Sequence, residues 1–189
     1  MDSSATWTCD CGKLRFRLEP VEGTRCVCYC RDCQAFLAHL GRGDIADEVG
    51  GSDLFQTTPN RVVLEAGGEH LANLRLTEKG PLRWYATCCG TPVCNTGASR
   101  MLPLASFLVR SFDGEVGPIV ARVNRKGARG HIEGEAGNVG RLVRAFIWRA
   151  LKVLVTGAYR KTPFFKGDGT PVAPTTRLSD EERARAYGD

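Results

Sequence analysis

The amino-acid sequence predicts a mainly β fold made of small sheets, with a helical extension at the C-terminus. Three observations lead to this prediction. The first 120 residues contain short runs in which apolar and polar residues alternate, separated by glycine and proline. Eight of the nine cysteines fall into three dense groups that are far apart in the sequence. A broad apolar stripe at helical spacing appears only after residue 138.

The strands are expected in order along residues 1–115, the cysteine-rich β domain. In "KLRFRLEP", Leu14, Phe16 and Leu18 alternate with basic residues, as in a half-buried strand. Three more strands are expected from "RVVLE", "HLANLRL" and "LRWYAT", which are separated by "AGG" and "EKGP". Before these three strands, directly after Cys33, "QAFLAHLG" has apolar residues at helical spacing and ends at Gly41, so it predicts a short helix.

The composition changes near residue 114. Glycine and charged residues are frequent over 116–137, which predicts a linker before a basic helical extension, 138–189. Asn138 is expected to cap a helix that runs to about Ala158, and "SDEERARAY" is expected to form a short capped helix.

The net charge of +5 is unevenly distributed. Residues 1–120 carry 12 basic and 14 acidic residues, whereas residues 121–189 carry 14 basic and 7 acidic residues. The chain opens without a basic leader and an apolar segment, and no apolar run reaches the roughly 20 residues of a membrane-spanning helix. We therefore expect a cytoplasmic protein with no transmembrane segment.

The cysteines are expected to bind a metal rather than to form disulfides. Their number is odd, and a reducing compartment disfavours a disulfide framework. In a tetrahedral zinc site the bonds to sulfur are about 2.3 Å long, so the sulfur atoms lie roughly 3.8 Å apart. Closely spaced cysteines reach this separation easily, and this spacing occurs in "CDC", "CYCRDC" and "CCG". The sequence therefore predicts Zn²⁺ as the cofactor.

These motifs carry a resemblance to a known family. C-x-C-G near the start, then C-x-C-x-x-C-Q, then C-G-T-P about 60 residues later, is similar to the glutathione-dependent formaldehyde-activating enzyme family, which includes centromere protein V. "DLFQTTPNRV" and "LRWYATCCGTPVCNT" resemble an uncharacterised bacterial branch of it. The resemblance covers roughly residues 5–115 and implies a β fold of small sheets built around zinc.

The resemblance implies a structural zinc held by four cysteines. Three of them correspond to Cys9, Cys11 and Cys89. The fourth ligand of the family lies three residues before the last one, and Ala86 occupies that position here. The structural site of this chain therefore departs from the pattern of the family.

Two cysteines are candidates to replace the missing ligand. Cys88 is the nearest, although neighbouring residues of a strand face opposite ways, so the strand must end in a turn there. Gly90 and Pro92 are compatible with such a turn. Cys94, beyond the turn, is the second candidate, and a site that is lost or completed otherwise is the third possibility.

The resemblance also implies a second zinc at Cys28, Cys30 and Cys33, which match the family pattern without departure. Three protein ligands leave one coordination position open, as in catalytic zinc sites. Cys33 is expected at a helix start, where the backbone favours a thiolate. Cys26 is a further thiol nearby, and a fourth ligand would close the site and make it structural.

Zinc with three thiolates is a weak Lewis acid and suits the binding of a further thiol as thiolate. The family activity is the reversible formation of a carbon–sulfur bond between glutathione and formaldehyde. The resemblance thus implies a carbon–sulfur lyase-like reaction, with Cys28, Cys30 and Cys33 as catalytic ligands and a small-molecule thiol such as glutathione as partner. Whether the protein is an enzyme is left open.

Other polar and aromatic residues near the motifs are given structural interpretations. Arg31 and Asp32 are expected as solvated loop charges, and Gln34 either as a donor to a thiolate or as helix N-terminal polarity. Trp84 and Tyr85 are expected in the core beside the metal. No role is assigned to the histidines, which are His39, His70 and His131.

Three alternatives remain. The protein could be a non-catalytic zinc module that mediates interactions with proteins, membrane surfaces or nucleic acid. The helix "RLVRAFIWRALKVLV" could lie on an anionic membrane, although we favour docking on the β domain, and it lacks the motifs of a nucleic-acid binder. A thiol redox role ranks last, because no C-x-x-C lies in a βαβ context. The sequence makes no prediction of oligomeric state.

Overall fold

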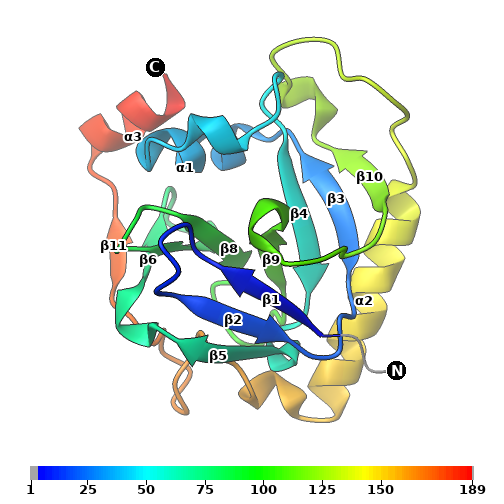
Figure 1. Ribbon diagram of the computed structural model, residues 1–189, viewed down its shortest axis with the longest axis vertical. Helices are drawn as coiled ribbons and strands as arrows, with labels where there is room; N and C mark the ends of the chain where they lie inside the picture. The colour runs from blue at the N-terminus through cyan, green and yellow to red at the C-terminus, as the bar shows by residue number, and fades with distance from the viewer. Residues whose placement is uncertain (1–3, 189) are drawn as a thin grey trace.

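The computed structural model describes residues 4–188 and has the mainly β architecture that was predicted, with a helical C-terminal part (Figure 1). The strands are β1 Ala5–Thr8, β2 Arg15–Leu18, β3 Thr24–Cys28, β4 Ser52–Thr57, β5 Val62–Ala66, β6 Leu71–Arg75, β7 Leu82–Ala86, β8 Pro92–Thr96, β9 Ala105–Leu108, β10 Ile119–Val123 and β11 Thr175–Arg177. The helices are α1 Arg31–His39, α2 Val139–Val155 and α3 Asp180–Tyr187.

The described strands form two sheets. The small sheet has the order β1-β2-β5 and the large one the order β10-β3-β4-β9-β8-β7-β6-β11. Leu14, Phe16 and Leu18 are fully buried, which confirms the alternation seen in the sequence. The three strands expected between residues 61 and 87 are also present, as β5, β6 and β7.

An aromatic core lies between the two sheets. Trp7 and Phe16 of the small sheet contact Phe107 of the large sheet, with ring centroids 6.2 and 5.7 Å away. Trp84 packs 5.2 Å from Phe164, which comes from the loop after α2. All five side chains are completely buried, so the sheets form one hydrophobic body, and the expected core position of Trp84 is confirmed.

The segments after residue 115 complete both edges of the large sheet. β10 lies within the stretch expected as a linker and pairs in parallel with β3. β11 lies within the expected extension and pairs in parallel with β6. The domain boundaries of 1–115, 116–137 and 138–189 stay predictions, but segments from all three ranges share this sheet.

α2 and α3 begin where the sequence indicated, whereas α2 ends at Val155, before the expected end near Ala158, and α1 begins at Arg31, before the predicted segment. Asn138 caps α2, its side chain accepting a hydrogen bond of 2.7 Å from the Arg141 N–H. Ser179 and Glu182 form a capping box at α3. α1 and α3 pack together at one end of the molecule, while α2 runs along β10 and β3 (Figure 1). Within residues 4–188, no helix has both the length and the apolar character needed to cross a membrane.

Candidate metal centres

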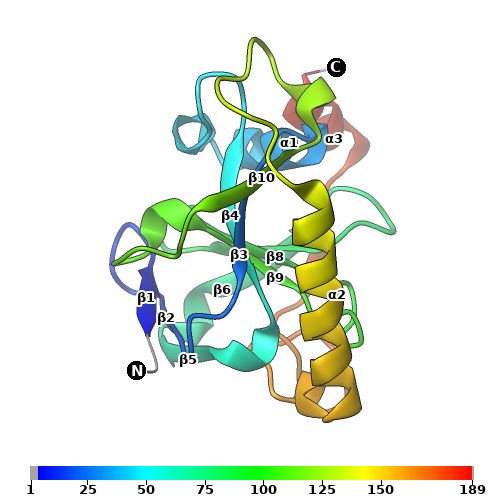
Figure 2. The same cartoon turned by 90° about the vertical axis from the view of Figure 1, so that its right-hand side faces the viewer.

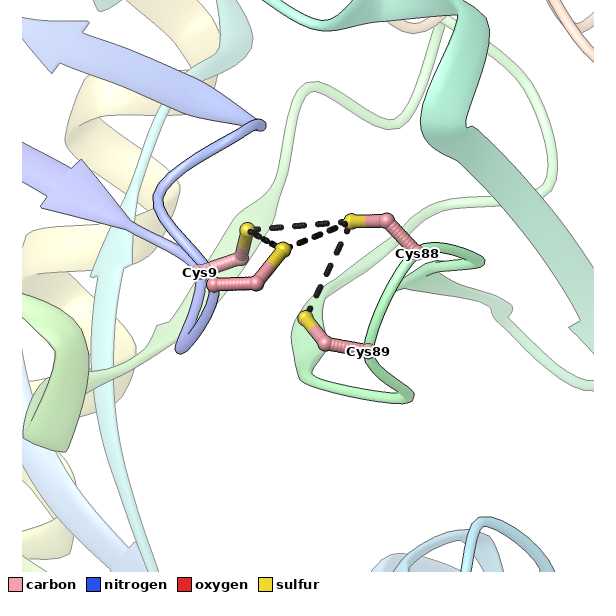
Figure 3. A group of neighbouring side chains, drawn as sticks. Cys9, Cys88 and Cys89 are labelled. Carbon is pink, nitrogen blue, oxygen red and sulfur yellow. Dashed lines mark hydrogen bonds between the residues drawn. The ribbon is translucent and has the colours of Figure 1, made fainter.

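Four cysteine sulfurs meet where the small sheet approaches the large one. This four-cysteine cluster consists of Cys9, Cys11, Cys88 and Cys89. The Sγ atoms of Cys9 and Cys11 are 3.6 Å apart, and the Cys88 Sγ lies 3.9 Å from the first and 3.3 Å from the second. The Cys89 Sγ is 3.8 Å from that of Cys88. Figure 3 shows the sulfurs of the two segments pointing toward one another.

A tight turn brings Cys9 and Cys11 to this position. Neither cysteine lies in a strand, because β1 ends at Thr8 and the pair lies in the turn before β2. Gly12, with φ +78°, donates its N–H to the Cys9 carbonyl oxygen at 2.9 Å and closes the turn. The N–H of Leu14 then donates to the Cys9 sulfur at 3.3 Å, a bond that favours a thiolate.

The neighbouring pair Cys88 and Cys89 lies in a turn after β7, as the sequence required if both were to face one metal. The N–H groups of Cys89 and Gly90 both donate to the carbonyl oxygen of Ala86, at 3.4 and 2.8 Å. Because the strand ends there, the two adjacent side chains can converge. Cys94 lies in β8, is buried in the core and does not join the cluster.

The four-cysteine cluster fits a tetrahedral metal. The four sulfur–sulfur separations given above, 3.3 to 3.9 Å, bracket the roughly 3.8 Å of a zinc–thiolate tetrahedron. Burial opposes ionisation of Cys89, but hydrogen bonds from Thr91 and from the Cys11 backbone outweigh it and lower the pKa of Cys89 to about 6. Burial instead raises the pKa of Cys88 and of Cys9, so the hydrogen bonds favour a thiolate at Cys89 among these three residues.

Three further cysteines converge at the junction of β3 and α1. This three-cysteine cluster consists of Cys28, Cys30 and Cys33, whose Sγ atoms all lie within 4.8 Å of one another. Cys28 ends β3, Cys30 is the N-cap of α1, and Cys33 lies in its first turn. The Cys30 sulfur accepts a bond of 3.3 Å from the Cys33 N–H. Cys30 is the partly exposed member, whereas the other two are buried.

Cys26 stays outside the three-cysteine cluster although it shares a face of β3 with Cys28. Its side chain is fully buried and packs in a hydrophobic cluster that includes Leu54, Leu108 and Ala121. Burial raises the pKa of Cys26 to about 12, so this thiol stays neutral. Cys26, which as a fourth ligand would have closed the site, is therefore a core residue in this structure.

The three thiols share a negative charge. Hydrogen bonds from Cys30 and Cys33 lower the pKa of Cys28 well below the ordinary value of a thiol. The same shared bonds raise the pKa of Cys33. One thiolate stabilised by two thiols, inside a largely buried pocket, is an arrangement that attracts a soft cation.

A buried arginine lies against the three-cysteine cluster. Arg83 of β7 is 3% exposed, and its Nη1 lies 4.0 Å from the Cys33 sulfur and 3.2 Å from the Asn95 Oδ1. Its Nη2 is 3.6 Å from the carboxylate of Asp32. Tyr187 of α3 donates its hydroxyl to the same carboxylate at 2.8 Å. Three successive polar contacts therefore connect the C-terminal helix to the cluster: Tyr187 with Asp32, Asp32 with Arg83, and Arg83 with Cys33.

The expectation that Asp32 is a solvated loop charge is wrong. It lies in α1 and bridges Tyr187 and Arg83, while the guanidinium of Arg31 stacks 5.5 Å from the Tyr187 ring. The reason is that α3 packs on α1 and covers this face of the helix. No sequence signal pointed to Arg83 except a charge within the otherwise apolar strand "LRWYAT".

Asn124 is a second residue of the three-cysteine cluster that the sequence did not indicate. It follows β10 and its Nδ2 donates to the Cys28 sulfur at 3.3 Å. Its φ of +55° is in the left-handed region, which asparagine tolerates better than most residues. The segment that follows packs so tightly that a Cβ at Gly127 would lie 2.2 Å from the Tyr29 carbonyl oxygen.

Gln34 has neither of the roles expected for it. Its Nε2 donates to the carbonyl oxygens of Tyr29 and Gly127, at 3.0 and 2.8 Å, and its Oε1 accepts from Arg129 at 2.7 Å. Gln34 thereby fastens the segment after β10 to α1 instead of contacting a thiolate. This contact helps to hold Asn124 in place at the cluster.

A small, mainly apolar cavity borders Cys33 and Arg83. Its volume is about 10 Å³, close to the space that one water requires. Asn95, Ser106 and Ser52 also line it, and the buried Ser52 hydroxyl has no hydrogen-bond partner among the described residues. The cavity beside Cys33 therefore contains one hydroxyl group, that of Ser52, whose hydrogen-bonding capacity is not satisfied.

Among residues 4–188, only cysteines form the two groups that could hold a metal ion. The histidines lie elsewhere, as expected, and they are His39, His70 and His131. Tyr85 is half-buried beside Phe36 and Leu74. The structure thus brings together the seven cysteines proposed as ligands, in the two predicted sets, and separates Cys26 and Cys94 from them.

Comparisons with known proteins give one family and distant structural neighbours. Residues 1–176 match the model of a family of unknown function, DUF6151. No curated protein matches the chain. A solved Rhodobacter sphaeroides protein, a structural genomics target, shares 16% identity at a TM-score of 0.40; the match covers 60% of this chain and 96% of that one.

Proposed function

The chain belongs to the DUF6151 family, and we propose that it is a zinc protein with one structural and one reactive centre. The four-cysteine cluster would hold the structural zinc. The three-cysteine cluster would hold the second zinc and leave a coordination position open for a small-molecule thiol such as glutathione. The observation that carries this proposal is the exclusion of Cys26, which leaves three protein sulfurs at the second centre.

Zinc at the three-cysteine cluster would supply an electrophilic position that keeps an incoming thiol in its thiolate form. The residues around it fit that task. Arg83 offsets the negative charge of three thiolates, and Asn124 donates a hydrogen bond that fixes the Cys28 sulfur. Cys30 is the partly exposed ligand, so a substrate would approach from its side.

The proposed reaction is the reversible addition of the thiol to a small aldehyde. A bond forms between the thiol sulfur and the carbonyl carbon, and the thiol proton ends on the carbonyl oxygen. The reverse reaction breaks the same carbon–sulfur bond, and neither direction needs an oxidant or a reductant.

Kinship with the glutathione-dependent formaldehyde-activating enzymes belongs to this proposal. It is supported by the order of the cysteine motifs and by the two clusters that they form in space. A cytoplasmic location also belongs to it, because nine free thiols suit a reducing compartment.

The test is an assay of the purified zinc-loaded protein with glutathione and formaldehyde, followed by NMR exchange spectroscopy. We expect the protein to accelerate the exchange, and Cys30→Ser to remove the acceleration. Cys26→Ser is the matched control, and it should retain activity because Cys26 lies outside the cluster. Equal rates for the wild type and Cys30→Ser would exclude catalysis at this centre and leave a structural zinc module.

A further inference from the structure

Helix α2 is attached to the body by only one of its faces. Leu142 and Val153 are buried against the large sheet. Arg149 also belongs to the docked face and is 8% exposed. Its Nη2 donates to the Thr24 Oγ1 at 2.9 Å and lies 3.4 Å from the Gln56 carbonyl oxygen. α2 therefore docks on the β domain as predicted, but a buried arginine lies in the docked face, and part of the apolar stripe, including Ile147 and Leu151, stays exposed.

The opposite face of α2 is apolar and open. Five branched side chains repeat at every fourth residue along the whole helix and are exposed, together with an aromatic one. These six residues, the outer face of α2, are Val139, Val143, Ile147, Trp148, Leu151 and Val155. Trp148 is 62% and Val155 85% exposed. In Figure 2 the full length of α2 is turned to the viewer, and no described element lies in front of it.

An exposed apolar row of this length requires an explanation, since monomeric proteins rarely leave large contiguous apolar patches in water. The outer face of α2 is not the face that packs on this chain, because α2 already contacts β3 and β10 with its opposite face. The helix is 17 residues long and lies flat along the molecule, so it presents a surface rather than a membrane-spanning segment.

The charged residues of α2 indicate which kind of surface its outer face would bind. The helix contains no acidic residue, and its exposed charges are Arg141, Arg144 and Lys152. At helical spacing these three lie around Trp148 and border the outer face. The Lys152 ammonium lies 5.2 Å from the centre of the Trp148 ring. Basic residues beside tryptophan and branched apolar side chains are the composition of helices that lie in the interface of an anionic bilayer.

We propose that the outer face of α2 docks this protein on the surface of membranes that contain anionic phospholipids. A second copy of the chain is a poorer occupant. A symmetric contact would place the same basic face against itself, and α2 carries no carboxylate to compensate. An anionic bilayer satisfies both properties of the face, because its headgroups pair with the cations and its acyl region accepts the apolar row.

Vesicle binding by the zinc-loaded full chain tests the proposal. The protein is mixed with vesicles of pure phosphatidylcholine or of equal parts phosphatidylcholine and phosphatidylserine, and bound protein is separated by flotation. We expect binding to the serine-containing vesicles and a blue shift of tryptophan emission. The shift reports Trp148, because Trp7 and Trp84 are already fully buried.

Three pairs of substitutions make the test specific. Arg144→Gln with Lys152→Gln should weaken binding about 25-fold, roughly fivefold for each basic side chain at an anionic surface. Lys79→Gln with Lys166→Gln removes two exposed charges elsewhere and should leave binding unchanged. Ile147→Ser with Leu151→Ser should abolish the blue shift while circular dichroism and zinc content stay those of the wild type.

Three outcomes would overturn the proposal. They are an absence of binding to both kinds of vesicle, equal losses in the two charge pairs, and a dimer in sedimentation that Ile147→Ser with Leu151→Ser dissociates. The last result would assign the face to a second copy of the chain. None of these outcomes depends on the chemistry proposed for the three-cysteine cluster.

Discussion

The two cysteine clusters are made of the same side chain but are constructed in opposite ways. In the four-cysteine cluster, Cys9 meets Cys88 across 79 positions of sequence, so the cluster joins the turn after β1 to the turn after β7. In the three-cysteine cluster, Cys28 and Cys33 are 5 positions apart. A metal in the first would tie two sheets together, whereas a metal in the second would mainly order the start of α1.

The groups that contact the sulfur atoms also differ between the two clusters. The four-cysteine cluster is supported by local donors, the Leu14 N–H and the Thr91 hydroxyl. The three-cysteine cluster has a buried cation, Arg83, and a side-chain donor, Asn124, both supplied by distant strands. The comparison indicates that the sequence separation of the cysteines determines which parts of the fold a bound zinc would hold together. The buried charge beside the cluster, here that of Arg83, would influence the reactivity of the zinc.

The largest effect is expected from breaking the four-cysteine cluster. Cys88→Ser should lower the free energy of unfolding by about 5 kcal/mol or more, because loss of a structural metal also releases the link between the sheets. Urea unfolding followed by circular dichroism measures the change. Cys94→Ala is the matched control, since Cys94 is buried nearby but outside the cluster.

That control should cost about 1 kcal/mol, the effect of a small cavity, and keep the metal content of the wild type. If Cys88→Ser were as stable as Cys94→Ala, the four-cysteine cluster would have no structural role.

A smaller effect is expected from the charge beside the three-cysteine cluster. Arg83→Met should weaken zinc binding there by about 10-fold to 100-fold, the usual range for residues that support metal ligands. Arg83→Lys keeps the charge and should recover part of the loss. Competition with a chromophoric chelator measures the affinity.

Zinc bound at the four-cysteine cluster would serve as the internal reference, because Arg83 contacts Cys33, Asn95 and Asp32 instead of that cluster. Unchanged chelator competition in a folded Arg83→Met protein would show that the guanidinium does not compensate the thiolates.

The smallest effect is expected at Asn124. Asn124→Gly keeps the left-handed backbone but removes the bond to the Cys28 sulfur, so zinc at the three-cysteine cluster should bind only a few-fold more weakly. Asn124→Ala should show the same loss and, in addition, about 1 kcal/mol less stability, because alanine is strained at this φ. Wild-type affinity in the glycine variant would remove Asn124 from the site.

Much of the fold could be predicted because its signals are local. Alternation in "KLRFRLEP" marked β2, and Asn138 marked the start of α2. β10 and β11 carried no comparable signal, since each is an edge strand whose partner is far away in sequence. The Gly-rich stretch around β10 therefore resembled a linker.

The cysteines of both clusters could be predicted because thiol spacing reflects the geometry of metal binding. Arg83, Asn124 and the contacts of Asp32 could not, because they reach the three-cysteine cluster from β7, the end of β10 and the interface with α3. Only the folded chain brings them together. The burial of Arg149 on α2 likewise depends on Thr24 and Gln56, which helical periodicity does not reveal.

The most direct test of the account is the zinc content of protein purified anaerobically under reducing conditions, measured by mass spectrometry. The account predicts two zinc ions per chain in the wild type and in Cys26→Ser, and one in Cys30→Ser. X-ray absorption should then show only sulfur ligands in the Cys30→Ser protein. A folded wild-type protein that contains no metal would contradict the account, and so would loss of a zinc ion in Cys26→Ser.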